Sequence, residues 1–260
     1  MFKRSSPVAF WSEEAPRLGF KLIDKNLDEG KNWDEALRIG REVMAHTIAK
    51  TGMRVGPDTS VVEIGCGIGR LVFALAHDAK EVVGADVSPW YIEQARQKNE
   101  FDNVRFELID GHRLELETID ECDVVFSHCV FVLLEVEAIA SYARDAYRML
   151  RPGGQFIFEL ESMPHTILSP AARIMRRGLH KAGVKQWRGW PTDPRFKRRA
   201  HDFEKLVRTL LSAGFLFERV ADDPGHTWFV ARKPAAEEAP REAPRLGASR
   251  DSEPAAAEAR

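Results

Sequence analysis

The sequence has 260 residues, 44% of them hydrophobic and 30% charged, which is typical of one large or two small globular domains with a substantial core. The 38 lysines and arginines nearly balance the 40 aspartates and glutamates, which argues against a protein that coats nucleic acid over its whole surface. No apolar run approaches the roughly 20 residues that span a bilayer, and no secretory signal is recognised. Three cysteines without metal-ligand spacing predict neither a disulfide scaffold nor a metal site, and favour a reducing, cytoplasmic location.

The N-terminal segment is weakly patterned, and we expect Phe10, Trp11 and Phe20 to be its packing anchors. From Asn32, placed as an N-cap, apolar residues recur on one face and predict a helix to about Lys50. The sequence therefore divides into an N-terminal segment with this cap helix, a main domain and a C-terminal tail. Their ranges are 1–50, 51–233 and 234–260.

The main domain alternates short apolar runs with amphipathic stretches. The runs predict strands at 61–64, 81–86, 104–109, 123–128 and 155–160. Helices are expected between them at 69–78, 89–99 and about 136–150, and again at 202–213. Two further strands, 214–220 and 226–233, are expected to form a hairpin that closes the domain. Apolar strands that alternate with helices indicate an α/β fold, in which a parallel sheet carries helices on both faces.

The tail, residues 234–260, consists almost entirely of Ala, Pro, Glu and Arg, with Leu246 as its large apolar side chain. Such a segment cannot bury enough surface to offset its ordering entropy, so disorder is expected.

A glycine-rich turn follows the first predicted strand. Gly65, Gly67 and Gly69 let the backbone approach a ligand closely, and the amides of the next helix favour an anionic group. A dinucleotide-binding turn requires a third glycine at position 70, where this chain has Arg70. The pattern is instead E-x-G-x-G-x-G, with Glu63 on the strand before the turn.

Two more carboxylates end the next strands. Asp86 lies 21 residues after Gly65, the spacing at which an acid accepts hydrogen bonds from ribose hydroxyls. Asp110, followed by Gly111, ends the third strand, where a carboxylate could accept from an adenine amino group. Either acid alone could be a helix cap or a loop residue. Three such features at successive strand ends indicate an adenosine cofactor.

The chain here resembles the class I S-adenosylmethionine-dependent methyltransferases, most closely the small-molecule, methyltransferase type 11-like branch. The matching motifs are 61–71 (VVEIGCGIGRL), 82–96, 108–112 (LIDGH), 123–128 and 150–159 (LRPGGQFIFE). The resemblance covers about residues 33–233 and implies a Rossmann-like, seven-stranded, mostly parallel sheet whose last strand is antiparallel.

The resemblance implies S-adenosyl-L-methionine as cofactor and assigns residues to it. The methionine part would contact Glu63 and the glycines, the ribose Asp86, and the adenine Asp110. We also assign Val87, Gly111 and Ser127 to the cofactor site. Where the family often has an aromatic or histidine pair after the fourth strand, this chain has Val132 and Leu133, which leaves the acceptor chemistry open.

Methyl transfer requires in-line alignment and exclusion of water, and a general base is needed only for a hydroxyl or a protonated amine. His128, just past the fourth strand, is the candidate base, and Glu161 and His165 follow the fifth strand at the same edge. The alternative for His128 is a histidine satisfied by the backbone or by the cofactor.

Residues 162–200 form a basic insert. Between residues 171 and 201, ten lysines and arginines accompany a single acid, Asp193. We assign Trp187, Arg188, Trp190 and Arg195 to the acceptor, as aromatic walls and anion-binding groups. The alternative is a solvated basic surface.

The favoured function is therefore methyl transfer to an O or N atom of a small, anionic acceptor. Two alternatives remain open: a methyltransferase that holds RNA or an acidic protein through the insert, and a catalytically silent S-adenosylmethionine-binding protein. The sequence does not give the oligomeric state.

Overall fold

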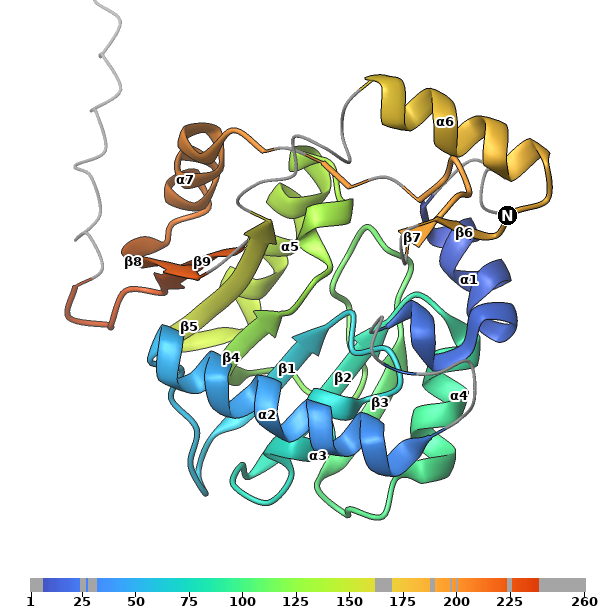
Figure 1. The fold of residues 1–260 in the computed structure, drawn as a ribbon. Helices are drawn as coiled ribbons and strands as arrows, with labels where there is room; N and C mark the ends of the chain where they lie inside the picture. Colours follow the sequence, from blue (N-terminus) through green and yellow to red (C-terminus); the bar gives the residue numbers. More distant parts are fainter. Residues whose placement is uncertain are drawn as a thin grey trace, which may run out of the picture.

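The computed structural model describes residues 7–23, 27, 32–161, 170–187, 190–196, 198–199, 201–223 and 226–238. Within these ranges a seven-stranded sheet has the order β3-β2-β1-β4-β5-β9-β8 (Figure 1). The strands are β1 (Ser60–Ile64), β2 (Glu81–Asp86), β3 (Val104–Leu108), β4 (Cys122–Ser127), β5 (Leu150–Glu161), β8 (Leu216–Asp223) and β9 (His226–Arg232). Strands β1 to β5 pair in parallel, and β9 is antiparallel to both β5 and β8. The predicted α/β sheet with an antiparallel last strand is confirmed.

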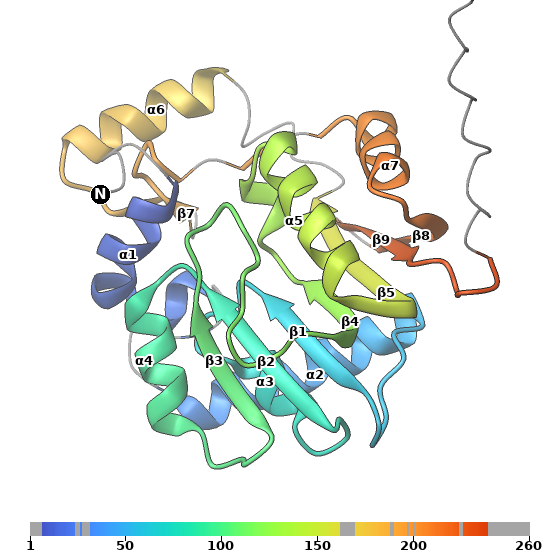
Figure 2. The same cartoon turned by 180° about the vertical axis from the view of Figure 1, so that it is seen from behind.

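Helices cover both faces of this sheet (Figures 1 and 2). One face packs against α2 (Trp33–Thr51), α3 (Arg70–Leu75) and α4 (Pro89–Lys98), and the other against α5 (Val136–Met149) and α7 (Phe203–Ser212). Adjacent residues of β4 alternate between the two cores: Val124 and Phe126 join the first and Val125 the second. Because both faces are buried, the central strands β1, β2 and β4 are mostly apolar, which is why the sequence reveals them.

The N-terminal segment contains a helix that the sequence did not predict. It forms α1 (Pro7–Leu18), followed by the short 3-10 helix η1 (Gly19–Leu22). Phe10 and Phe20 are buried, as expected of packing anchors, and α1 packs beside α4. Pro16 lies inside the helix, so tertiary packing rather than local propensity stabilises it. The predicted cap is confirmed, because Asn32 Oδ1 accepts a hydrogen bond from the Glu35 amide.

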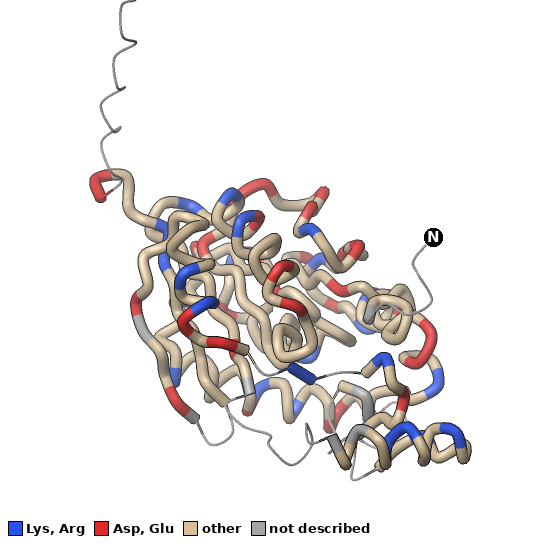
Figure 3. The backbone as a smooth tube through the Cα atoms, turned by 90° about the horizontal axis from the view of Figure 1, so that it is seen from above, with Lys and Arg blue, Asp and Glu red and all other residues tan. Residues whose placement is uncertain are grey.

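The basic insert lies over the carboxyl ends of the strands, beside α1 (Figure 1). Its described part contains α6 (Pro170–Lys181) and a ribbon of β6 (Gln186–Trp187) and β7 (Trp190–Pro191). A 3-10 helix, η2 (Phe131–Leu133), follows β4 below it. Lys and Arg recur along the insert, whereas acidic and basic residues are interspersed over the rest of the chain (Figure 3).

After β9 the described chain continues to Glu238, whose carboxylate forms an ion pair with Arg232. The rest of the predicted tail lies outside the described residues. No helix in the described part of the chain is both long and apolar enough to cross a bilayer.

Candidate functional site

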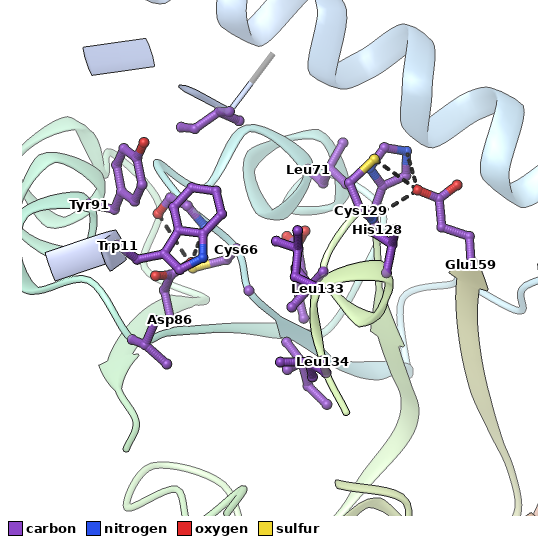
Figure 4. A pocket seen from close by; sticks show the side chains of 18 of the residues that line it. Trp11, Cys66, Leu71, Asp86, Tyr91, His128, Cys129, Leu133, Leu134 and Glu159 are labelled. Atoms are coloured by element: carbon purple, nitrogen blue, oxygen red, sulfur yellow. Dashed lines mark hydrogen bonds and ion pairs between the residues drawn. The ribbon is translucent and has the colours of Figure 1, made fainter. Parts of the chain in front are cut away.

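A cavity of about 690 Å³ opens at the carboxyl ends of the central strands (Figure 4). Its walls come from α1, α2, the loops after β1, β2, β3 and β4, the ends of β5 and β9, and the insert. Strand order reverses between β1 and β4, because the chain builds outward from β1 in one direction and then in the other. Ligands of open α/β sheets bind at such a reversal, so the cavity has the expected position for a cofactor.

The glycine turn forms one wall of the cavity. Gly65 and Gly67 line it with φ angles of +78° and +55°, and a Cβ atom on Gly65 would lie 2.2 Å from the Val130 side chain. Gly69 also has a positive φ, but it precedes α3, and a Cβ atom there would lie 2.6 Å from the Phe106 ring. Two of the three predicted glycines therefore lie at the cavity, and Gly69 serves the packing of α3 on the sheet.

Asp86 joins the glycine turn to the end of β2. Its buried carboxylate accepts hydrogen bonds from the Gly67 amide at 2.9 Å and from the Ser88 amide at 2.8 Å. Burial raises the pKa of Asp86, and these backbone donors oppose the rise. Asp86 and the adjacent Val87 both line the cavity, as the sequence predicted. An acid held in this way can present its carboxylate edge to ribose hydroxyls without moving.

Two predicted cofactor residues have a different place from the one expected. Asp110 is exposed and is not among the residues that line the cavity; its carboxylate accepts hydrogen bonds from the amides of His112 and Arg113. Its neighbours Ile109 and Gly111 line the cavity instead.

Ser127 is buried and is not among the cavity-lining residues; its hydroxyl donates to the carbonyl of Ile64, which does line the cavity, at 2.9 Å. The cofactor contacts of Asp110 and Ser127 therefore stay predictions.

Glu63 and Arg70 are two buried polar side chains in the cavity wall. Glu63 is 2% exposed and Arg70 5%. Burial raises the pKa of Glu63 to about 8; Arg70 opposes this rise and Asp86 adds to it. Glu63 Oε2 and Arg70 Nη1 have no hydrogen-bond partner within the described structure. Such orphaned polar atoms in a wall fit a ligand that carries both an ammonium and a carboxylate group. The sequence predicted a role for Glu63, whereas Arg70 served only to exclude a dinucleotide.

A polar cluster lies at the opposite end of the cavity, where β4, β5 and β9 end. The Glu159 side chain is 4% exposed and accepts hydrogen bonds from the Cys129 amide at 2.8 Å and from the Cys129 thiol at 2.9 Å. His128 Nε2 lies 3.8 Å from Glu159 Oε1, and His226 Nδ1 lies 3.4 Å from Oε2. Burial, followed by the charge of Glu159, raises the pKa of the Cys129 thiol, which is therefore a neutral donor.

His128 thus lies at the cavity, in the position predicted for a catalytic residue. The structure describes Glu161 only as the last residue of β5, and His165 lies outside the described residues. Sequence reasoning missed Glu159 and predicted only a packing role for Cys129. Alternation along β5 could have identified Glu159, because a carboxylate in an otherwise apolar buried strand needs a partner.

Arg195 does not reach into the cavity. Its guanidinium forms ion pairs with Asp193 at 2.8 Å and, across the fold, with Glu13 at 2.5 Å and Glu14 at 3.5 Å. Two acids of α1 pair with this charge, so its binding of the acceptor stays a prediction that the described geometry does not support. Arg195 instead joins the insert to α1.

The other residues assigned to the acceptor are only partly described. Trp187 pairs with Trp190 across the β6–β7 ribbon and is not among the cavity-lining residues. The Trp190 side chain and the whole of Arg188 lie outside what the structure describes.

The insert lines the cavity with Gln186, Pro191, Phe196 and Arg198. Phe196 packs against Phe10 and Trp11 of α1, with ring centroids 5.6 and 6.2 Å apart. The insert and α1 therefore form a joint cover over the cavity. None of these four lining residues belongs to a recognisable sequence motif, so sequence reasoning missed them.

Comparison with known proteins agrees with this geometry. A family model described as a methyltransferase domain matches residues 61–154. A ubiquinone biosynthesis O-methyltransferase of Pseudomonas fluorescens is 34% identical over 100 residues, which are 38% of this chain and 42% of that protein. A demethylmenaquinone methyltransferase of Tropheryma whipplei is 30% identical over 119 residues, 45% of this chain and 48% of that protein. The matched stretch thus spans less than half the length of either relative.

Two solved structures share the fold over most of the chain. Magnesium protoporphyrin IX methyltransferase from Synechocystis PCC 6803, with bound S-adenosylhomocysteine, has a TM-score of 0.57 at 18% identity and covers 88% of this chain and 100% of that one. Phosphoethanolamine N-methyltransferase 1 of Haemonchus contortus has a TM-score of 0.61 at 18% identity and covers 90% and 49%.

Residues 61–154 are accordingly similar to a methyltransferase domain, and S-adenosylmethionine is the cofactor of this class of site. The residues present fit it. Asp86 suits the ribose, and the orphaned atoms of Glu63 and Arg70 match the two charged groups of its methionine part.

Proposed function

We propose that this protein transfers a methyl group from S-adenosylmethionine to an oxygen or nitrogen atom of a small acceptor that carries one anionic or acidic group. The observation that carries the proposal is one continuous cavity that joins the Asp86 end to the His128 end. A cofactor on the glycine turn and an acceptor beside His128 would share this cavity. Relatives named as O-methyltransferases and N-methyltransferases support both kinds of acceptor atom.

When bound, the cofactor supplies an activated methyl group, so the protein needs to hold the acceptor in line and exclude water. The joint cover formed by α1 and the insert would exclude water. His128, at the end of β4, is the catalytic residue that we place against the acceptor atom. Glu161 and His165 remain proposals for the same edge, since the structure does not describe their side chains.

The cavity walls favour an acceptor with an apolar body. Val132, Leu133, Phe196 and Trp228 line it beyond the glycine turn. Arg198 is the described cationic residue that the insert contributes to the lining, and it supports recognition of a single anionic group rather than a polyanion. Trp187, Arg188 and Trp190 remain proposed acceptor contacts from the outer part of the insert.

Cofactor binding is tested first, by calorimetry with S-adenosylhomocysteine and, separately, NAD. We expect a response to S-adenosylhomocysteine and none to NAD; the opposite result would end the proposal. The acceptor is then sought with methyl-labelled cofactor against metabolite and RNA fractions of a cell extract. Label in a metabolite fraction supports a small acceptor.

Label in the RNA fraction would favour the macromolecular alternative. In that case affinity should fall steeply with salt, with a slope of log affinity against log salt concentration of about −0.7 per phosphate contact. Cofactor binding without any labelled product would favour a silent binding protein.

A further inference from the structure

We propose that His128, Cys129 and Glu159 form a binding site for a divalent transition-metal ion, and that Zn²⁺ best fits their chemistry. Each residue offers one ligand atom, and the three atoms lie within 4.8 Å of one another. Figure 4 shows the three side chains pointing toward one another at one end of the cavity. Zn²⁺ is borderline soft and is bound in proteins by thiolate sulfur, imidazole nitrogen and carboxylate oxygen, which is this donor set.

The distances are close to those of a tetrahedral ion. Zn²⁺ bonds of about 2.0–2.3 Å place neighbouring ligand atoms roughly 3.3–3.8 Å apart. His128 Nε2 and Glu159 Oε1 are already 3.8 Å apart, and Cys129 Sγ and Glu159 Oε1 are 2.9 Å apart. An ion therefore needs the thiol and the carboxylate to separate by less than about 1 Å, and the imidazole and the thiol, which lie within 4.8 Å of each other, to come to a similar spacing. Side-chain rotation can supply both changes.

The backbone holds these ligands in place. Cys129 has a φ of +60°, and it is the one non-glycine residue with positive φ in the described part of the chain. This conformation costs free energy for a side chain with a Cβ atom, and it turns both the amide and the thiol of Cys129 toward Glu159. His226 Nδ1, 3.4 Å from the other carboxylate oxygen, is positioned to orient Glu159 from outside, as partners of metal ligands do.

The charges balance when the ion binds. The Cys129 S–H bond breaks, its proton leaves to the buffer, and the thiolate forms the metal bond; thiolate and carboxylate together then neutralise Zn²⁺. Burial and the Glu159 carboxylate keep the thiol protonated when no ion is bound, and Arg70 and Arg198 oppose this effect, so the thiolate forms only with the metal bond. The expectation from sequence that the cysteines bind no metal arose because Glu159 is 30 residues from Cys129, so no short ligand spacing exists.

Three protein ligands leave a fourth position open toward the cavity, as in catalytic zinc sites. An acceptor hydroxyl there would become more acidic, because a bound cation stabilises its anion. In that state His128 is a ligand, and loss of the acceptor proton depends on the ion. This last step rests on the proposed function, whereas the metal site itself does not.

The test uses the full-length protein, treated with EDTA and freed of chelator. Titration with ZnCl2 by calorimetry in two buffers of different ionisation enthalpy gives affinity, stoichiometry and proton release. The ligand variants are Cys129→Ser, Glu159→Gln and His128→Asn. Cys122→Ala, which removes a buried thiol at the start of β4, is the matched control. S-adenosylhomocysteine binding and a melting curve check the fold of each variant.

We expect one Zn²⁺ per chain, release of a proton, and affinity that falls more than about 100-fold in each ligand variant, since loss of an outer partner alone costs about 10–100-fold. Cys122→Ala should bind as the wild type does. Failure of the wild type to bind Zn²⁺, or equal binding by Cys129→Ser and Glu159→Gln, would overturn the metal site. Cofactor binding and methyl transfer could persist in that case, so the two proposals fail separately.

Discussion

The two ends of the cavity are built in different ways. At the cofactor end, Gly65, Gly67 and Asp86 lie within one β-α-β unit, and backbone amides satisfy the carboxylate. At the acceptor end, the walls come from segments far apart in sequence, such as His128, Glu159 and Arg198 of the insert. The cofactor end is a local structure repeated wherever its motif occurs, whereas the acceptor end exists only after the whole chain has folded.

Because of this difference, we expect substitutions at the two ends to affect different properties of the protein. Cofactor affinity should depend on a few residues near the glycine turn and should be insensitive to the insert. The cover that α1 and the insert form over the cavity should depend on ion pairs and aromatic contacts between these two segments. The following variants separate the two ends.

The largest effect is expected for Asp86→Ala. Hydrogen bonds to a charged group contribute about 1.5–3 kcal/mol, so S-adenosylhomocysteine binding measured by calorimetry should weaken roughly 10–100-fold. Asp110→Ala is the matched control, because that carboxylate is exposed and caps its own loop. Equal losses in both variants would show that Asp110 contacts the cofactor after all.

Arg195→Ala should loosen the cover and leave the cofactor end intact. Loss of the contacts with Asp193, Glu13 and Glu14 should lower the melting temperature by roughly 2–8 °C, equivalent to about 1–2 kcal/mol, with S-adenosylhomocysteine affinity unchanged. Arg177→Ala, an exposed arginine of α6, should change neither quantity. A cofactor affinity that falls with Arg195→Ala would contradict the separation of the two ends.

Glu63 predicts a pH dependence of stability. Burial raises its pKa to about 8 in the folded protein, so between about pH 4.5 and 8 the folded state holds a proton that the unfolded state has lost. The contribution of Glu63 to stability is therefore complete at low pH and is lost as pH rises through about 8.

Glu63→Gln removes this titration, so its melting temperature should gain about 2–5 °C relative to wild type between about pH 7 and 8.5. The exposed Glu117→Gln is the control and should follow the wild-type curve. Parallel pH curves for Glu63→Gln and wild type would show that Glu63 is ionised in the folded protein throughout this range.

The smallest effect is expected for deletion of residues 239–260. Leu246 is the one large apolar side chain in this part of the sequence, so the segment has little apolar surface to pack on the domain. Melting temperature and cofactor affinity should therefore both stay the same. Glu238→Ala in the intact chain, which breaks an exposed ion pair with Arg232, should cost less than about 1 kcal/mol. A large loss of stability on deletion would show that the segment packs on the domain.

The sequence by itself determined the strands, most helices and the glycine turn with Asp86, because these depend on periodicity and on turn chemistry that operate over a few residues. It did not determine that Asp110 accepts from the amides of its own loop, that Ser127 donates to β1, that Arg195 pairs with α1, or that Glu159 lies against Cys129 and the histidines. Those facts depend on the direction of side chains and on contacts between residues as many as 182 positions apart, which only the folded chain brings together.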